Sequence, residues 1–333
     1  MRVLFVGGNG NISAACSRLC VERGMEVFLL NRGRRGTPIP GATSLVADVK
    51  DAGQVETVLG DLEFDAVADF VAFVPDDVER DISLFARRCR QYLFISSASA
   101  YQKPLPHPIV TESTPLKNPF WQYSRDKIAC EDRLVAAYRQ QDFPMVIVRP
   151  SLTYDTVWPV AIGAWDDFTL IDRIRRGGEM IVHGDGTSLW TVTHAEDFAL
   201  GFVGLIGNTA AIGHAFHITS DEVLTWDQIY TTIAQAAGVE PRLVHMPSEL
   251  LARLDDRLRG SLLGDKAHSA VFDNTKIKRF VPGFVARIPF HVGVRKTLAW
   301  FEAEKSRQRI VPETNRAMDR YLEAWRRAGA PTP

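Results

Sequence analysis

A glycine-rich turn directly after the first apolar run constrains the fold of this chain more than any other feature. The run Arg2–Val6 is followed by Gly7-Gly8-Asn9-Gly10-Asn11-Ile12-Ser13, and then by apolar residues at helical spacing. Glycines let backbone N–H groups approach a pyrophosphate, and the start of the next helix offers its positive dipole to the same anion. Ser13 stands where a third glycine is usual. This context predicts a dinucleotide site that includes Gly7, Gly10, Asn11 and Ile12.

Strand and helix signals alternate through the first half of the chain. After Arg2–Val6, the strand-like runs are Glu26–Leu30, Ala42–Val46, Ala66–Phe73, Tyr92–Ser96 and Met145–Arg149. Helical stretches at 76–90 and 125–139 lie between them. Alternating strands and helices predict an α/β fold with a doubly wound parallel sheet of the Rossmann type. We expect a dinucleotide-binding domain at 1–150 and a mainly substrate-binding part at 151–333, with helices at 226–237 and 248–259 and some elements returning to the sheet.

Composition and charge exclude several other classes of protein. Hydrophobic residues make up 46% and charged residues 24% of the 333 residues, which is typical of a globular protein. The net charge of −1 gives no overall field to attract nucleic acid. We find no apolar run long enough to span a membrane, no cleavable signal pattern after Met1, and no paired-cysteine framework. We therefore expect a cytoplasmic protein with no membrane or nucleic-acid partner.

The residues after the second and third strand-like runs bear on the choice of cofactor. An acidic residue normally ends the second strand and binds the adenosine ribose. Here Asn31 and Arg32 stand in that place, and Arg34 and Arg35 follow. Because a guanidinium suits a 2′-phosphate, this segment favours NADP(H) over NAD(H), although the arginines could also belong to a solvated loop. Two further candidates on the adenine side follow the third run, Asp48 and Val49.

Two later segments carry a serine, a tyrosine and a lysine that are suited to acid–base chemistry. Ser97 follows a strand-like run, and Tyr123 and Lys127 are spaced i, i+4, so they share one face of a helix. A free tyrosine is too weak an acid to exchange protons well at neutral pH. A nearby ammonium would lower the pKa of the phenol, and the serine hydroxyl could hold the reacting oxygen. We expect no metal, since the pairs His183/Asp185 and His194/Asp197 match no strong zinc spacing.

With these motifs the chain resembles the extended short-chain dehydrogenase/reductase superfamily, of the NAD-dependent epimerase/dehydratase type, over about residues 1–300. The shared features are the glycine turn, Ser97, Tyr123 with Lys127, and the segments 148–150, 184–186, 197 and 272–276. The resemblance implies that Tyr123 is the catalytic acid/base, that Lys127 binds the nicotinamide ribose, and that Ser97 contacts the substrate oxygen. It also implies four further cofactor contacts, at Val71, Ala72, Pro150 and Leu152.

Three departures from the family pattern restrict the substrate. Ala98 and Ser99 stand where the sugar 4,6-dehydratases carry two acidic residues, so water elimination of that kind lacks its acid/base pair. Trp190 stands in the segment that usually supplies an arginine for a nucleotide diphosphate. Together with Ser13 and Asn31, these departures are similar to an atypical branch that includes chloroplast stem-loop RNA-binding proteins.

The sequence thus predicts an NAD(P)-dependent oxidoreductase or epimerase acting at a secondary alcohol or ketone carbon. We expect a sugar-like or nucleoside-like small molecule as substrate, in contact with Ser97, Ser99, Tyr154 and Trp190. The alternatives are an RNA-binding protein and a cofactor sensor on the same fold, neither with turnover. A homodimer is expected by analogy with the superfamily alone. Whether the outcome is epimerisation or net redox stays open at this level.

Overall fold

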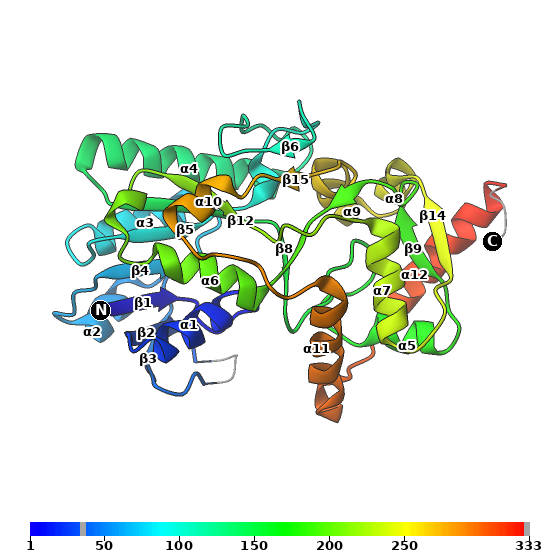
Figure 1. The fold of residues 1–333 in the computed structure, drawn as a ribbon, viewed down its shortest axis with the longest axis horizontal. Helices are drawn as coiled ribbons and strands as arrows, with labels where there is room; N and C mark the ends of the chain where they lie inside the picture. Colours follow the sequence, from blue (N-terminus) through cyan, green and yellow to red (C-terminus); the bar gives the residue numbers. More distant parts are fainter. Residues whose placement is uncertain (34–37, 330–333) are drawn as a thin grey trace.

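A seven-stranded parallel sheet forms the centre of the computed structural model, which describes residues 1–33 and 38–329 (Figure 1). The strand order is β12-β7-β5-β4-β1-β2-β3. The strands are β1 (Arg2–Val6), β2 (Glu26–Asn31), β3 (Ala42–Val46), β4 (Ala66–Asp69), β5 (Tyr92–Ile95), β7 (Met145–Pro150) and β12 (Ala215–Ile218). The order reverses beside β1, which is the doubly wound arrangement predicted from the alternation of strands and helices.

Helices cover both faces of this sheet. The helices around it are α1 (Ser13–Glu22), α2 (Ala52–Leu59), α3 (Pro75–Phe85), α4 (Gln122–Gln141), α6 (Ala195–Leu205) and α10 (Thr275–Phe280). Successive residues of β1 point to opposite faces, so Val3 and Phe5 pack with α1 and α6, whereas Leu4 and Val6 pack with α2, α3 and α4. Because both faces are buried, β1 is an unbroken apolar run rather than an alternating one.

The second half of the chain builds a smaller unit beside the carboxyl ends of the central strands (Figure 1). Its helices are α5 (Thr169–Arg175), α7 (Trp226–Ala236), α8 (Ser248–Leu254), α9 (Asp256–Ser261), α11 (Phe290–Glu302) and α12 (Pro312–Arg327). Its strand pairs are β8 (Leu152–Tyr154) with β11 (Val192–His194), β9 (Met180–His183) with β14 (Leu243–Met246), and β10 (Leu189–Trp190) with β13 (Leu224–Thr225). Trp158, Trp190 and Trp226 are buried in its core.

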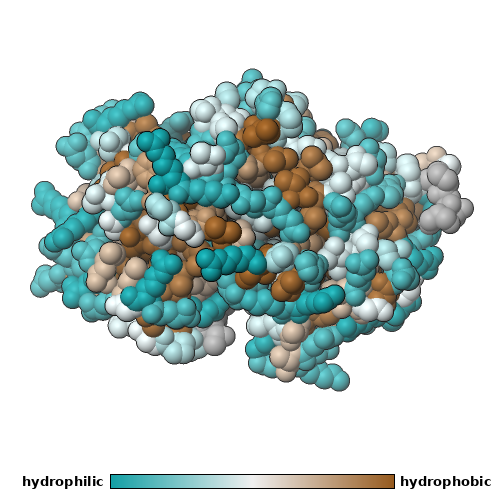
Figure 2. Space-filling model, viewed as in Figure 1, coloured by the Kyte–Doolittle hydropathy of each residue, from teal (hydrophilic) through white to brown (hydrophobic). Residues whose placement is uncertain are grey.

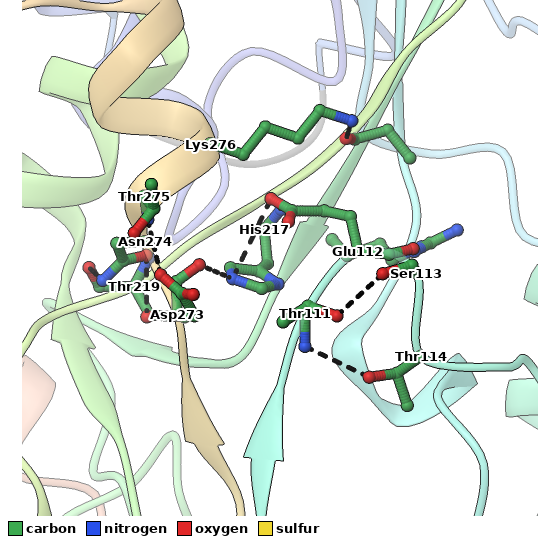
Figure 3. Close-up of polar contacts among 12 residues, drawn as sticks. Thr111, Glu112, Ser113, Thr114, His217, Thr219, Asp273, Asn274, Thr275 and Lys276 are labelled. Carbon is green, nitrogen blue, oxygen red and sulfur yellow. Dashed lines mark hydrogen bonds and ion pairs between the residues drawn. The ribbon is translucent and has the colours of Figure 1, made fainter.

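Elements from the second half also return to the central sheet. Strand β12 pairs with β7, and α6 packs against α1 on one face. The segment 271–276 lies beside this returning strand. Its first part, β15 (Val271–Phe272), pairs with β6 (Ile109–Val110) in a separate two-stranded sheet, and α10 after it packs against β12. Figure 3 shows how polar side chains hold this segment: His217 bonds to the Asp273 carbonyl at 2.8 Å, and the Asn274 amide donates to the Thr219 carbonyl at 3.0 Å.

Several predicted elements end earlier in the structure, for local reasons. Strand β4 stops at Asp69, because its carboxylate accepts hydrogen bonds from the backbone N–H groups of Val71 and Ala72 at 2.6 and 2.7 Å and turns the chain. The single helix predicted over 248–259 is two helices, since Asp255 is extended and caps α9 by accepting from Arg257 N–H.

One face of the molecule shows how polar and apolar residues are distributed over the surface. Figure 2 shows hydrophilic residues over much of one face, with hydrophobic residues gathered near its middle, where the sheet-bearing half meets the other half. None of the helices within the described residues combines the length and the apolar character that a bilayer crossing requires.

Candidate functional site

A cavity of about 590 Å³ lies at the carboxyl ends of the central strands, where open α/β sheets bind their ligands. It is lined from the glycine turn, the ends of β4, β5 and β7, the first turns of α4, and six residues of the second half. The lining residues are Gly7, Gly10–Ser13, Phe70, Val71, Phe73, Ile95–Ser99, Trp121, Tyr123, Lys127, Pro150–Thr153, Trp165, Asp265 and Lys266. A second hollow, at the opposite end of the sheet around Arg2 and Arg87–Arg90, includes none of the predicted site residues.

The glycine turn is tightly held. Gly7 has a φ of +81°, and a Cβ built on it would lie 2.4 Å from Cγ1 of Val71, so no larger residue fits there. The Ser13 hydroxyl donates to the Gly7 carbonyl at 2.6 Å and accepts from the Gly10 N–H at 2.8 Å. Ser13 therefore stabilises the turn across its width, which explains how a serine can replace the usual third glycine.

The polar groups of this turn fit a nucleotide cofactor. Helix α1 begins at Ser13 without a side-chain cap, and Gly10–Ser13 line the cavity, so the positive end of the helix dipole lies at the cavity. The Asn11 amide donates to the Thr153 carbonyl at 3.0 Å, whereas its buried Oδ1 has no hydrogen-bond partner among the described residues. A buried oxygen without a partner is costly, and a ligand that donates a hydrogen bond would satisfy it.

Tyr123 and Lys127 lie on the face of α4 that borders the cavity, as their spacing predicts. The Lys127 ammonium is buried and donates to the Ala72 carbonyl at 2.6 Å and to the Ile95 carbonyl at 2.8 Å. It lies 5.9 Å from the centre of the Tyr123 ring. The ammonium is thus anchored to two strand ends, β4 and β5, with its charge next to the phenol.

The structure corrects one expectation about this pair. We expected the ammonium to lower the pKa of Tyr123, but burial raises that pKa. The nearby Asp265 carboxylate raises the pKa further, whereas the Ser97 hydroxyl lowers it by a smaller amount than burial raises it. Burial also lowers the pKa of Lys127, to about 8. Desolvation is the main cause of the raised pKa of Tyr123, while the Lys127 ammonium donates to two backbone carbonyls.

Three hydroxyl groups beside the phenol form a hydrogen-bonded chain. Ser124 donates to the Ser99 hydroxyl at 2.8 Å, and Ser99 lies 2.9 Å from the Ser97 hydroxyl. Ser97, at the end of this chain, is near enough to Tyr123 to lower the pKa of the phenol, against the larger effect of burial. Ser99 was predicted from its position after the strand, whereas Ser124 was not predicted, because its only signal is its place next to Tyr123.

Two other buried side chains that support the site were also not predicted. The Asn118 amide donates to the Ser99 carbonyl at 2.9 Å and to the Gly264 carbonyl at 2.7 Å, so it joins segments far apart in the sequence. Glu131, one turn after Lys127, accepts hydrogen bonds from the Ser96 hydroxyl at 2.5 Å and from Arg149 at 2.5 and 2.9 Å. Glu131 continues the i, i+4 series of Tyr123 and Lys127, and this spacing could have predicted that it lies on the same face of the helix.

The remaining predicted residues occupy several places. Val71, Pro150 and Leu152 line the cavity, and Ala72 contributes the carbonyl that Lys127 binds. The four residues predicted on the adenosine side lie outside the cavity lining, at the ends of β2 and β3; they are Asn31, Arg32, Asp48 and Val49. Arg34 and Arg35 fall outside the described residues.

Tyr154 and Trp190, which we expected at the substrate, are buried in the core of the second half and do not line the cavity. Tyr154 packs edge-on against His194 and Phe290, at centroid distances of 5.3 and 5.4 Å, and Trp190 packs against Trp226 at 5.5 Å. Within residues 1–33 and 38–329, no three histidine, cysteine or acidic side chains gather as a metal site would require.

Comparisons with known proteins identify the family and the fold. The family model described as NAD dependent epimerase/dehydratase family matches residues 3–219. A protein of Streptomyces kanamyceticus named 2'-dehydrokanamycin reductase is 25% identical over 290 residues, which cover 86% of this chain and 81% of that protein. The chloroplast stem-loop binding protein of 41 kDa b of Arabidopsis thaliana is 25% identical over 261 residues, covering 73% and 65%. The crystal structure of a dTDP-glucose 4,6-dehydratase of Bacillus anthracis in complex with NAD superposes with a TM-score of 0.73 at 15% identity, covering 92% of this chain and 98% of that one.

Proposed function

Because the chain belongs to the NAD-dependent epimerase/dehydratase family, we propose that it interconverts a secondary alcohol and a ketone on a sugar-like small molecule. In this proposal Tyr123 exchanges the hydroxyl proton, while Ser97 and Lys127 stabilise the charge that develops on the oxygen. The single observation that carries the proposal is that these three residues line one cavity with the uncapped end of α1 and the glycine turn.

The cofactor would bind along this cavity between the glycine turn and α4. When bound, a nicotinamide ring would supply the redox chemistry by donating or accepting hydride. The residues that would hold the cofactor are Gly7, Gly10, Asn11, Ile12, Val71, Lys127, Pro150 and Leu152. Two of the three ammonium protons of Lys127 bind the Ala72 and Ile95 carbonyls, and the third would be available to the ribose. The half-exposed Phe73 ring lies over this ammonium, with 4.6 Å between the Lys127 nitrogen and the ring centre.

In the direction of ketone reduction, Tyr123 is the residue that would give its proton to the carbonyl oxygen. Burial raises the pKa of the phenol, so in the resting protein it holds its proton at neutral pH. A protonated phenol is a proton donor, which is what a carbonyl oxygen needs as it becomes a hydroxyl. The relative from Streptomyces kanamyceticus carries the name of a reductase, which supports the same direction.

The substrate in this proposal carries no nucleotide diphosphate. The stretch at Trp190 offers no arginine for such a group, and Trp190 itself is buried against Trp226. At the cavity, Ala98 and Ser99 provide no acidic pair for eliminating water. A sugar or nucleoside whose alcohol or ketone carbon reaches Ser97 and Tyr123 fits the site better than a nucleotide sugar that undergoes dehydration.

Substitution of Tyr123 tests the acid–base role. We expect Tyr123→Phe to lower turnover of a ketone substrate by about 10²–10⁴-fold, because the phenyl ring cannot donate a proton. Binding of NADPH should be unchanged, and the exposed Tyr138→Phe should behave as wild type. Unchanged turnover in Tyr123→Phe would exclude the assignment. Binding of the dinucleotide without turnover of any ketone would favour a sensor, and RNA binding that weakens steeply with salt would favour the RNA-binding alternative.

The preference for NADP(H) rests on Arg32, which is exposed at the end of β2 where an acidic residue is usual. We expect Arg32→Ala to weaken NADPH binding by about tenfold and to leave NADH binding unchanged, because one charge-assisted contact to the 2′-phosphate is lost. Titration of both nucleotides against wild type and variant, with Arg87→Ala as an exposed-arginine control, measures this. Equal affinity of the wild type for the two nucleotides would contradict the preference.

We propose that the protein works in the cytoplasm, because all four cysteines are unpaired, which suits a reducing compartment. A homodimer is proposed by analogy with the family alone.

A further inference from the structure

A short π-helical turn brings two charged side chains to the wall of the cavity. The turn spans Leu262–Lys266 and follows α9, and its last two residues, Asp265 and Lys266, line the cavity. Apart from Lys127, these two are the charged side chains that line it among the described residues. π-Helical turns are rare and frequently occur at functional sites.

The charges at this wall do not balance. The side chains of Lys103 and Lys266 keep only 2% and 13% of their surface exposed, and both ammonium groups share one carboxylate. Asp265 lies 3.5 Å from Lys103 and 3.9 Å from Lys266. Lys266 donates no hydrogen bond to any of the described residues. Besides Asp265 and the Lys103 ammonium, its charged group neighbours the Trp121 ring, whose centre lies 5.9 Å away. Since buried charges are normally paired and hydrogen-bonded, this wall has one positive charge in excess.

The turn is fixed in place before any ligand binds. The Gly264 carbonyl accepts from Asn118 at 2.7 Å, and the Lys266 carbonyl accepts from His183 at 2.9 Å and from the Trp226 indole at 3.2 Å. A Cβ on Gly264 would lie 2.9 Å from Cβ of Trp121, so this glycine lets the turn pack directly on the start of the Trp121 side chain. Preorganised groups cost little to order when a ligand arrives.

Resting on the proposed function, we propose that Lys266 binds an anionic group of the substrate, a carboxylate or a phosphate ester, and that Asp265 positions its ammonium. Lys103 is the second ammonium that holds Asp265 in place. The substrate class is therefore a sugar acid or a sugar phosphate, rather than a neutral or an amino sugar.

The two parts of the site lie beside the same indole. The Trp121 ring lies 4.9 Å from the Tyr123 ring and 5.9 Å from the Lys266 ammonium, so the acid–base residue and the anion-binding residue both neighbour this side chain. The effect of Asp265 on the pKa of Tyr123 reflects the same closeness. An anionic group a few bonds from the reacting carbon would reach Lys266 while the carbon stays at Tyr123.

Matched sugars that differ in charge test the inference. We would measure the affinity of the full-length protein, saturated with NADPH, for glucuronate, glucose 6-phosphate, glucose and glucosamine by calorimetry. The wild type should bind at least one anionic sugar about tenfold or more tighter than glucose, because a hydrogen bond to a charged group is lost in glucose. Lys266→Met should remove this preference, Lys266→Arg should retain it, and the exposed Lys117→Met should match wild type. Glucuronate against glucose 6-phosphate distinguishes the carboxylate from the phosphate.

Three results would overturn the inference: equal or undetectable binding of the four sugars, preference for glucosamine, or an anion preference that survives in folded Lys266→Met. Thermal unfolding of each variant shows whether it is folded. If Lys266→Met does not fold, Lys266→Arg, which keeps the positive charge, still tests whether the anion preference is retained. Failure of the proposed function is separate, since it would appear as absent NADPH binding or as turnover that Tyr123→Phe does not change.

Discussion

Replacement of Gly7 by alanine gives a quantitative test of how the glycine turn shapes the cavity. Gly7 has a φ of +81°, a conformation that costs an L-residue roughly 1–2 kcal/mol. The new methyl group would also lie 2.4 Å from Cγ1 of Val71, well inside van der Waals contact. Valine is stiff about χ1, so relief of this overlap requires the backbone to shift, at about 1–3 kcal/mol. We expect Gly7→Ala to lose about 2–5 kcal/mol of stability.

Gly24 provides the matched control. It has a φ of +74°, and a Cβ there would meet nothing within 4 Å, so Gly24→Ala carries the conformational cost alone, roughly 1–2 kcal/mol. Urea denaturation of both variants measures the two losses, and titration with NADPH measures the effect on the cavity. Because Val71 and Gly7 both line the cavity, we expect NADPH binding about tenfold weaker or more in Gly7→Ala, and unchanged in Gly24→Ala.

The double variant Gly7→Ala/Val71→Ala isolates the overlap. Without Cγ1 of Val71 the new methyl group has space, so the double variant should recover about 1–2 kcal/mol relative to the sum of the two single losses. Equal losses in Gly7→Ala and Gly24→Ala, with equal NADPH affinity, would refute the reasoning about this close contact.

Two further predictions concern buried charges on α4. The pKa of Lys127 is lowered to about 8, so its ammonium deprotonates in the folded protein as pH rises through about 8, whereas an unfolded lysine stays charged until nearer its usual value. Turnover should therefore fall above about pH 8, while the free energy of unfolding rises with pH across that window because the unfolded chain binds more protons. In Lys127→Arg the alkaline fall in a pH–rate profile should move to higher pH, and an unchanged profile would contradict the role of this ammonium. Glu131→Gln leaves the buried Arg149 without its counter-ion and should cost about 3–5 kcal/mol in urea denaturation. Glu79→Gln, which breaks the exposed pair with Arg133, should cost no more than about 1 kcal/mol, and equal losses in the two variants would show that burial does not govern the cost.

The elements that the sequence predicts well have local signals. The strand over Arg2–Val6 and the pair Tyr123 and Lys127 are read from periodicity and spacing alone, and the structure places the pair on α4 beside the glycine turn. Parallel strands bring their carboxyl ends to one edge, so residues that follow different strands were expected to meet there.

The features that the sequence does not predict depend on contacts between distant segments. Tyr154 comes shortly after the carboxyl end of β7, where a residue that contacts substrate is expected. His194 and Phe290, from later parts of the chain, pack against its ring and bury it. Asp265 and Lys266 reach the cavity only because Asn118 and Trp226 hold their turn. The direction of the pKa shift of Tyr123 follows from burial, which is a property of the assembled fold.

The place of β12 determines how this protein can be divided. Because β12 pairs along β7, a fragment that ends near residue 150 would leave a whole row of N–H and C=O groups on β7 open to water and to other chains. The same cut would strip α6 from α1 and uncover Phe5 and Cys16. We therefore expect the sheet-bearing half to stay soluble only together with β12 and α6, and an exchange of the second half between relatives would have to preserve this returning strand.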